Sequence, residues 1–336
     1  MLDFPRCGNA RAAEIAPLAP VRGCPELLPG TARDRRQPVR VLDQPRDTFI
    51  EANRLRLHLL EWGPCSGDQP PILLLHGFQE HAHAWDRLAP LLARAGRHVV
   101  AWDARGHGDS EWIGRGGYYH FADYVADVAF VVRHLGGRVS IVGHSMGGNV
   151  TLLYAGTEPA RVAAVAVIEG LGPVDTPMDA APRRHAGWIT DIERVARDER
   201  RDQTVDEAAA KLRRFFPLPE DVALHLVQHG TKPSGTDGRV VWKWDPLHAT
   251  RSPQPFYVAQ ARSFWARIAC PVLYLEGSTN LLSAKFEIAE RLAALDADKV
   301  TIEGAAHHPH LEQPEATARV LLDFLDRAEA AEPPPA

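Results

Sequence analysis

A serine lies at the centre of the pattern Gly143-His144-Ser145-Met146-Gly147, between a run of apolar residues and a segment with helical spacing. A sharp turn from a strand into a helix pushes the central side chain to the tip and leaves room only for small residues two positions to either side. A serine hydroxyl at its ordinary pKa is a poor nucleophile, so it needs a base, an orienting acid and an oxyanion hole. The pattern therefore predicts that Ser145 is a nucleophile whose partners come from elsewhere in the chain.

The segments that must position Ser145 alternate between strand-like and helix-like patterns from about residue 48 onward. A hairpin is predicted at residues 48–62, and later apolar runs such as "ILLL", "SIVG" and "AAVAVI" are each followed by a helical segment. Runs that are apolar at consecutive positions indicate strands covered on both faces, as in a parallel sheet between helix layers. Two of the helices are expected at about residues 85–94 and 121–135. The chain is therefore predicted to be an α/β protein.

The alternation stops near Leu171 and resumes near residue 263. We expect a first part of the core at residues 47–170, an inserted helical cap at 171–262 and a second part of the core at 263–330. A cap inserted there would cover the carboxyl ends of the strands, where open α/β sheets bind ligands. Its aromatic side chains are expected to pack in the cap's own core more often than they line a pocket; they are Trp188, Phe215, Phe216, Trp242, Trp244, Phe256 and Tyr257.

Four motifs in order give the chain a resemblance to the α/β-hydrolase fold serine hydrolases, the esterase- and lipase-like superfamily, over roughly residues 46–330. They are "LLLHGF" at 73–78, "WDARGHGDS" at 102–110, "VGHSMGG" at 142–148 and "AAHHPHLEQPEATARVLLDFL" at 305–325. The resemblance implies a mostly parallel eight-stranded sheet between helix layers, with an inserted helical cap. Fold alone does not name a substrate.

The first motif is expected to form the oxyanion turn, and the second is expected to form a loop held by its own side chains. The turn "HGF" follows a buried strand, so we expect the backbone N–H of Phe78 to meet that of Met146 and to form an oxyanion hole with it. Asp103 and Arg105 are expected to form a local ion pair that holds their loop. In the family, the histidines corresponding to His76 and His144 support the oxyanion turn and the nucleophile and do not act as the base.

Three histidines, His307, His308 and His310, are candidates for the base. In the family pattern the catalytic histidine precedes an "hLEqPe"-like segment by several residues, and that register falls on His307. His308 is followed by Pro309, which restricts its backbone, and His310 continues towards the last helix. The resemblance therefore implies that His307 is the base.

The acid departs from the commonest family pattern, because Asn280 occupies the position that usually holds an aspartate. An asparagine cannot stabilise an imidazolium as a carboxylate does. Some members of the superfamily instead place the acid after the preceding strand, where this chain has Glu169. A carboxylate at the end of an apolar strand is costly to bury without a partner, so Glu169 is the predicted acid. Asp175 and Glu276 are the alternatives.

A serine nucleophile implies an acyl-enzyme, with His307 as general base and then general acid. Epoxide hydrolases and haloalkane dehalogenases of this fold use an aspartate, so Ser145 argues against both. The expected reaction is hydrolysis of a carboxylic ester or a related acyl compound, and it requires neither a metal nor an organic cofactor. The alternatives are a carbon–carbon bond hydrolase, a cofactor-free oxygenase and a non-catalytic ligand-binding protein, the last favoured by Asn280.

Composition limits the partners further. A net charge of −5 over 336 residues predicts no nucleic-acid partner. The longest apolar runs fall well short of the roughly 20 residues that span a bilayer, and no apolar signal stretch opens the chain, so we expect no membrane span and a cytoplasmic location. The expected partner is a small molecule, an ester with an apolar acyl or aryl group. Residues 1–46, rich in proline and arginine, are expected to form a disordered tail.

Overall fold

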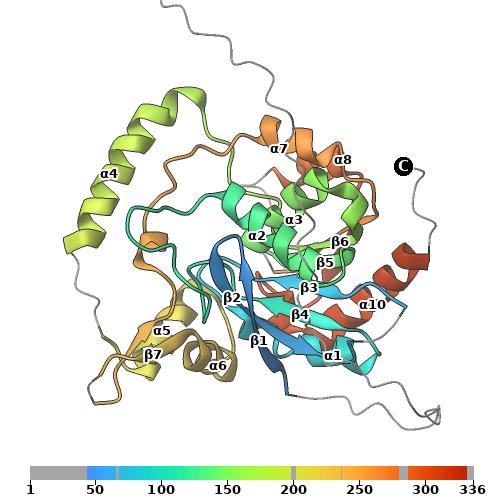
Figure 1. Cartoon of the computed structure of the whole chain (residues 1–336), viewed down its shortest axis with the longest axis horizontal. Helices are drawn as coiled ribbons and strands as arrows, with labels where there is room; N and C mark the ends of the chain where they lie inside the picture. Colours follow the sequence, from blue (N-terminus) through green and yellow to red (C-terminus); the bar gives the residue numbers. More distant parts are fainter. Residues whose placement is uncertain (1–43, 66–67, 198–201, 236, 280–286, 331–336) are drawn as a thin grey trace, which may run out of the picture. The chain divides into compact units, whose positions relative to one another are not determined.

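The computed structural model describes residues 44–65, 68–197, 202–235, 237–279 and 287–330 (Figure 1). The predicted N-terminal tail therefore lies almost entirely outside the described residues. Eight strands form one sheet in the order β1-β2-β4-β3-β5-β6-β9-β10. Their bounds are β1 Arg46–Ala52, β2 Leu55–Trp62, β3 Ile72–Leu75, β4 Val99–Trp102, β5 Val139–His144, β6 Val162–Ile168, β9 Val272–Gly277 and β10 Asp298–Ile302.

The sheet is mostly parallel, as predicted. Strand β1 pairs antiparallel with β2, β2 pairs antiparallel with β4, and the remaining neighbours are parallel. Every residue of β3, β5 and β6 is buried, which explains why their sequences are apolar without alternation. The central strands are therefore covered on both faces, and their carboxyl ends provide the edge on which a site can be built.

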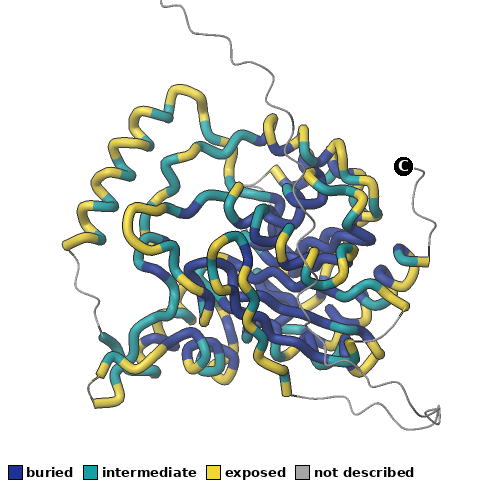
Figure 2. Tube along the Cα trace, viewed as in Figure 1, coloured by how far each residue is buried: buried dark blue, intermediate teal, exposed yellow. Residues whose placement is uncertain are grey.

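Helices cover both faces of the sheet (Figure 1). Leu73 and Leu75 of β3 belong to the apolar core beneath α2, α3, α7 and α8, whereas Ile72 and Leu74 belong to the core against α1 and α10. Figure 2 shows this buried interior along the strands. The helix bounds are α1 Ala89–Arg94, α2 Phe121–His134, α3 Met146–Thr157, α7 Val258–Trp265, α8 Ile288–Leu295, α9 Pro309–Glu312 and α10 Pro314–Ala330.

The segment between β6 and β9, residues 169–271, contains more than helices. Strands β7 and β8 form a small antiparallel hairpin within it. The helix α7 crosses the expected cap boundary at residue 262 and packs its buried Val258, Ala261 and Trp265 into the core beside α3. The other elements of the segment are η3 Met178–Ala180, α4 Ala181–Arg197, α5 Val205–Phe215, α6 Glu220–Gly230, β7 Thr231–Pro233, β8 Val240–Trp242 and η4 Pro246–Ala249.

Two local predictions were wrong. The helix expected at residues 85–94 is a 3-10 turn, η1 at Ala82–Trp85, followed by the separate helix α1. Proline is favoured in the first turn of a helix, where its missing N–H costs nothing, so Pro90 marks a helix start.

The expected ion pair between Asp103 and Arg105 is replaced by two pairs with distant partners. Asp103 Oδ2 lies 2.7 Å from Nδ1 of His58, and Arg105 Nε donates to Asp127 at 2.6 Å. Both carboxylates are buried. These pairs fix the loop to β2 and α2, and hydrogen bonds within the loop, such as that from the N–H of Asp109 to Oδ2 of Asp103 at 2.8 Å, add to them.

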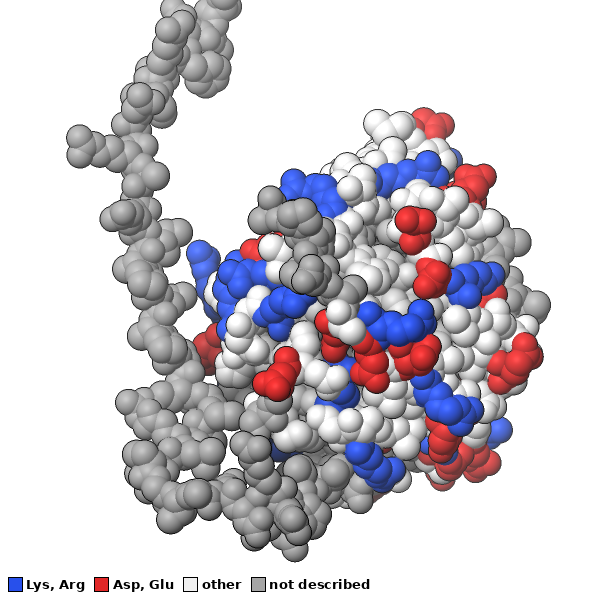
Figure 3. Space-filling model, turned by 90° about the vertical axis from the view of Figure 1, so that its right-hand side faces the viewer, with Lys and Arg blue, Asp and Glu red and all other residues white. Residues whose placement is uncertain are grey.

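No helix among the described residues is both long and apolar enough to cross a membrane. On the face drawn in Figure 3, lysine and arginine side chains are interspersed with aspartate and glutamate.

Candidate active site

Ser145 lies at the junction between β5 and α3. Its backbone has φ 48° and ψ −111°, a region that non-glycine residues rarely adopt, so the turn is strained. Its N–H donates to the carbonyl of Ile168 at 2.9 Å, which ties the junction to the neighbouring strand β6. Its side chain lines the main cavity of the described structure. The geometry is that of the predicted nucleophile elbow.

The flanking glycines explain why the elbow needs small residues. A Cβ atom added to Gly143 would lie 2.4 Å from the carbonyl oxygen of Gly147, and one added to Gly147 would lie 2.1 Å from that of Leu75. Both distances are well below van der Waals contact with rigid backbone. Glycine is therefore required at both positions for the strand to turn into α3 in this way.

Of the three candidate histidines, His307 lines the same cavity as Ser145. His308 points elsewhere, with Nε2 3.0 Å from Oε1 of Glu80, and His310 packs against Trp85 with ring centroids 4.5 Å apart. Burial lowers the pKa of His307 to about 3, and the neighbouring His144 and His308 add to the effect. His307 is therefore neutral near pH 7, as a general base must be.

Glu169 follows the last residue of β6 and has a positive φ of 53°. Its Oε1 accepts a hydrogen bond of 2.7 Å from the backbone N–H of Gly277, and its Oε2 lies 4.0 Å from Nδ1 of His307. The carboxylate is 4% exposed, and the Nδ1 atom is buried without a hydrogen-bond partner in the described structure. The 4.0 Å separation is longer than a hydrogen bond, but it places the predicted acid next to the predicted base.

The alternative acids have other partners. Asp175 Oδ1 accepts from the backbone N–H of Val258 at 2.7 Å, at the start of α7. Glu276 Oε1 lies 2.7 Å from Nζ of Lys299 on β10. Asn280, at the usual family position, lies outside the described residues. Among the candidate carboxylates, Glu169 is the one that lines the cavity with Ser145 and His307.

Phe78 and Met146, whose backbone amides are the predicted oxyanion hole, both line the cavity. Met146 is the first residue of α3, so its N–H has no partner within the helix, and it lies at the positive end of the helix dipole. The phenyl ring of Phe78 has no hydrogen-bond donor, so any contribution of this residue to an oxyanion comes from its backbone N–H.

Sequence reasoning missed Glu80, which lies beneath these residues. Its Oε2 accepts from the N–H of Gly77 at 2.8 Å and lies 3.1 Å from Nδ1 of His144. Nε2 of His144 in turn lies 2.9 Å from the carbonyl oxygen of His307. One carboxylate therefore connects the turn that carries Phe78 to the backbone of the candidate base. The only signal in the sequence was an acidic residue three positions after a glycine in a turn.

The charge state of Glu80 follows from its two histidine neighbours. Burial alone raises the pKa of this carboxyl, but His144 and His308 outweigh burial and hold it well below its ordinary value. Burial likewise lowers the pKa of His144, and Glu80 more than offsets this, so the pKa of His144 is raised. Glu80 and His144 therefore form a buried ion pair behind the candidate site.

The cavity has a volume of about 900 Å³, which suits a small organic ligand. Its lining is mainly apolar and aromatic. Of the seven aromatic residues singled out in the sequence, Phe256 and Tyr257 contribute to it, whereas Phe216 stacks on His307 at 5.8 Å between ring centroids. The aromatic residues of the lining are Phe78, Tyr118, Tyr119, Phe121, Tyr124, Phe256, Tyr257, Phe264 and Tyr274.

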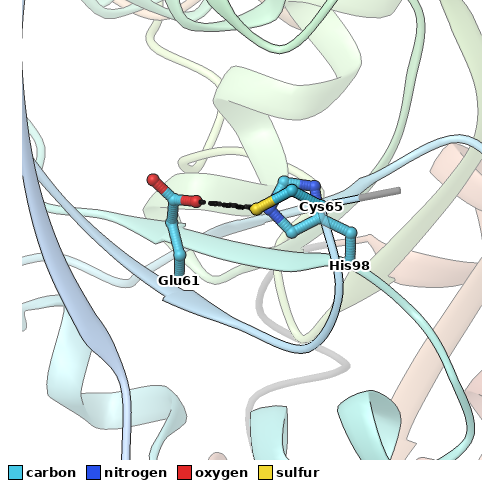
Figure 4. Close-up of side chains that lie close together, drawn as sticks. All are labelled: Glu61, Cys65 and His98. Atoms are coloured by element: carbon cyan, nitrogen blue, oxygen red, sulfur yellow. Dashed lines mark hydrogen bonds and ion pairs between the residues drawn. The ribbon is translucent and has the colours of Figure 1, made fainter. Parts of the chain in front are cut away.

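Several groups of side chains could in principle hold a metal ion. In Figure 4, Cys65 and Glu61 point towards one another beside His98, with Sγ 3.9 Å from the carboxylate. Arg46 already forms an ion pair with Glu61, however, and an arginine beside a site repels a cation. In the group Glu80, His144 and His308, both oxygens of the carboxylate already have hydrogen-bond partners within the chain. Neither group offers a suitable site.

The fold and the elbow define a class of proteins, and comparison with known proteins gives the same class. The model of the α/β hydrolase fold family matches residues 70–314, so the chain belongs to that family. A serine hydrolase-like protein of Danio rerio is 31% identical over 277 residues, covering 79% of this chain and 83% of that protein. The monoglyceride lipase of Rattus norvegicus is 25% identical to this chain, and the match covers 88% of this chain and 94% of the lipase.

A solved structure supports the same assignment. The crystal structure of a hypothetical protein from Pseudomonas aeruginosa PAO1 matches this chain with a TM-score of 0.76 and 30% sequence identity. The match covers 84% of this chain and 99% of the Pseudomonas protein. The predicted fold class and family are thereby confirmed, and the chain is a hydrolase-fold protein with hydrolase relatives.

Proposed function

We propose that the chain is a serine hydrolase that cleaves a carboxylic ester or a related acyl compound through an acyl-enzyme. The observation that supports the proposal is that Ser145, His307 and Glu169 all line one mainly apolar cavity, although they follow β5, β10 and β6. A nucleophile on a strained turn, a neutral imidazole and a buried carboxylate are the groups that acyl transfer requires.

In the proposed reaction, the hydroxyl of Ser145 attacks the carbonyl carbon of the ester while Nε2 of His307 takes its proton. The negative oxygen of the tetrahedral intermediate accepts hydrogen bonds from the N–H groups of Phe78 and Met146. As the intermediate collapses, His307 donates the proton to the departing alcohol. Water, deprotonated by His307, then attacks the acyl-enzyme, and the proton returns to Ser145 as the carboxylic acid leaves.

Glu169 is proposed to stabilise the imidazolium that forms in each half of this reaction. Oε1 accepts from the N–H of Gly277, and the proposed role requires Oε2 to move from 4.0 Å to within hydrogen-bond distance of Nδ1 of His307. The carboxylate then fixes the tautomer of the base and offsets its charge.

The cap is proposed to be residues 171–262, and it supplies much of the cavity wall. Val174, Leu247 and Phe256 add apolar surface there, and Arg184 adds a guanidinium whose Nε donates to the carbonyl of Ser252 at 2.8 Å. This lining favours substrates with an apolar acyl or aryl group. The lipase among the relatives is named for an ester substrate, which agrees with this class.

The first experiment is incubation of the purified chain with a fluorophosphonate probe, followed by peptide mapping. Labelling at Ser145, and its absence in Ser145→Ala, is the expected result. A folded chain that remains unlabelled would overturn the proposal and favour the non-catalytic binding protein. A series of p-nitrophenyl esters of increasing acyl length then measures the preference, with a β-diketone as the test of carbon–carbon hydrolysis.

A further inference from the structure

Three histidines and an aspartate form a cluster outside the proposed active site, between the turn η1 and the helix α6. His83 and Asp86 are three residues apart on and just after η1, and His225 and His229 are four residues apart on α6. Residues at this helical spacing share one face. None of the four lines the cavity that holds Ser145.

Two of the histidines lie against the carboxylate of Asp86. Oδ2 of Asp86 lies 2.8 Å from Nδ1 of His83 and 3.1 Å from Nε2 of His225. His229 completes the group, because one ligand atom from each of His83, Asp86 and His229 lies within 4.8 Å of the others. The ring centroids of His83 and His229 are 3.8 Å apart, and those of His225 and His229 are 4.6 Å apart.

Two features distinguish this cluster from an ordinary hydrogen-bonded one. Oδ1 of Asp86 is buried and has no hydrogen-bond partner among the described residues, which is costly for a carboxylate. The histidines also remain partly exposed, with side-chain exposures of 17% for His83 and 32% for His225, so an ion can enter from solvent.

We propose that His83, Asp86, His225 and His229 bind one divalent transition-metal ion of the zinc type. Imidazole and carboxylate groups suit Zn²⁺, which takes four such ligands in a tetrahedron at about 2.0–2.2 Å. Ligand atoms around a tetrahedral ion are then roughly 3.3 Å apart. The separations of 2.8 and 3.1 Å at Asp86 are close to that value, and the ligand atoms of His83, Asp86 and His229 lie within 4.8 Å of one another.

The ion would connect the hydrolase core to the segment between β6 and β9. Helix α6 already packs Val222 and Leu226 against Ala84 of η1 and Leu311 of α9. Phe216, four residues before α6, stacks on the ring of His307 at an angle of 12°. A metal bridge between η1 and α6 would hold this segment, and with it Phe216, against the base. Its role is therefore structural.

The test uses the full-length, untagged chain, stripped with EDTA and titrated with ZnCl₂ by calorimetry and by thermal unfolding. We expect one equivalent of zinc to bind and to raise Tm, because an ion that binds only the folded chain stabilises it. The double variant His225→Gln/His229→Gln should bind zinc at least about tenfold more weakly and lose the rise in Tm. Asp86→Asn, which keeps the side-chain shape, should behave in the same way.

The matched control is His134→Gln on α2, the same substitution at a histidine outside the cluster, and it should bind zinc as the parent chain does. Circular dichroism establishes that each variant is folded. Failure of the parent chain to bind zinc would overturn the proposal. So would binding that persists in the double variant and disappears in His307→Gln, because the ion would then occupy the proposed active site.

Discussion

Oε2 of Glu169 lies 4.0 Å from Nδ1 of His307, while Oε1 of the same carboxylate accepts a hydrogen bond from the N–H of Gly277. Residue 169 follows β6 and residue 307 follows β10, so the two meet because their strands end at the same edge of the sheet. Their proximity supports an acid after β6 in a chain whose usual acid position holds Asn280.

Removing the proposed nucleophile or the proposed base should abolish turnover without unfolding the chain. Ser145→Ala and His307→Ala should each lower kcat on a p-nitrophenyl ester by up to about a million-fold, leaving only catalysis by the oxyanion hole. Steady-state kinetics and thermal unfolding measure the two effects. A folded Ser145→Ala variant with unchanged turnover would contradict the proposed mechanism.

The acid is tested by comparing carboxylates. Glu169→Gln keeps the shape of the side chain but removes its charge, and a similar change in a related triad lowers turnover by about four orders of magnitude. Glu276→Gln is the matched control, because Glu276 pairs with Lys299 and does not line the cavity. The turnover of this variant should be nearly normal. Asn280→Ala should cost under about tenfold, the value of one neutral hydrogen bond.

Near-normal turnover in Glu169→Gln would show that this acid assignment is wrong. A large loss of turnover in Glu276→Gln would instead identify Glu276, on β9, as the acid. Asp175→Asn should then be measured as the remaining candidate.

Glu80 should be required for the stability of the fold. Glu80→Gln removes the carboxylate that pairs with His144 and His308, and losing one partner of a buried ion pair costs about 3–5 kcal/mol. Chemical denaturation measures the free energy of unfolding. Glu193→Gln is the control, because its pair with Arg197 is exposed on α4 and should contribute under about 1 kcal/mol. Equal effects of the two substitutions would contradict the inferred ion pair.

Stability should fall as pH drops below about 6.5, before most carboxylates titrate. Burial lowers the pKa of His81 to about 4 and that of His248 to about 3, so both stay neutral in the folded chain while the unfolded chain takes up protons. The free energy of unfolding then decreases with falling pH, by about 1.4 kcal/mol per pH unit for each such histidine, until pH reaches the folded pKa.

The variant His248→Phe keeps the aromatic contacts with His107 and Tyr119 but cannot titrate. Denaturation at pH 7, 6 and 5 should therefore give an average slope that is smaller than that of the parent chain by about 1 kcal/mol per pH unit, because the unfolded histidine is only partly protonated above pH 6. Identical slopes would show that His248 is not held neutral by burial.

The sequence alone determined the sheet and the elbow, because both depend on local patterns. Consecutive apolar residues in β3, β5 and β6 could be recognised as strands covered on both faces, and the glycines around Ser145 as the space that a tight turn needs. Glu169 could be proposed because some members of the superfamily that the chain resembles place the acid after this strand, and because a carboxylate at the end of an apolar strand is costly to bury without a partner.

Only the tertiary structure decided which side chains meet. The family register pointed to His307 among three nearby histidines, but it is packing that directs His307 into the cavity and turns His308 to Glu80 and His310 to Trp85. Asp103 and Arg105 were paired by their closeness in sequence, whereas the fold gives each a partner at least 22 residues away. Contacts of this kind depend on how β-strands and helices pack together, which no local pattern of residues encodes.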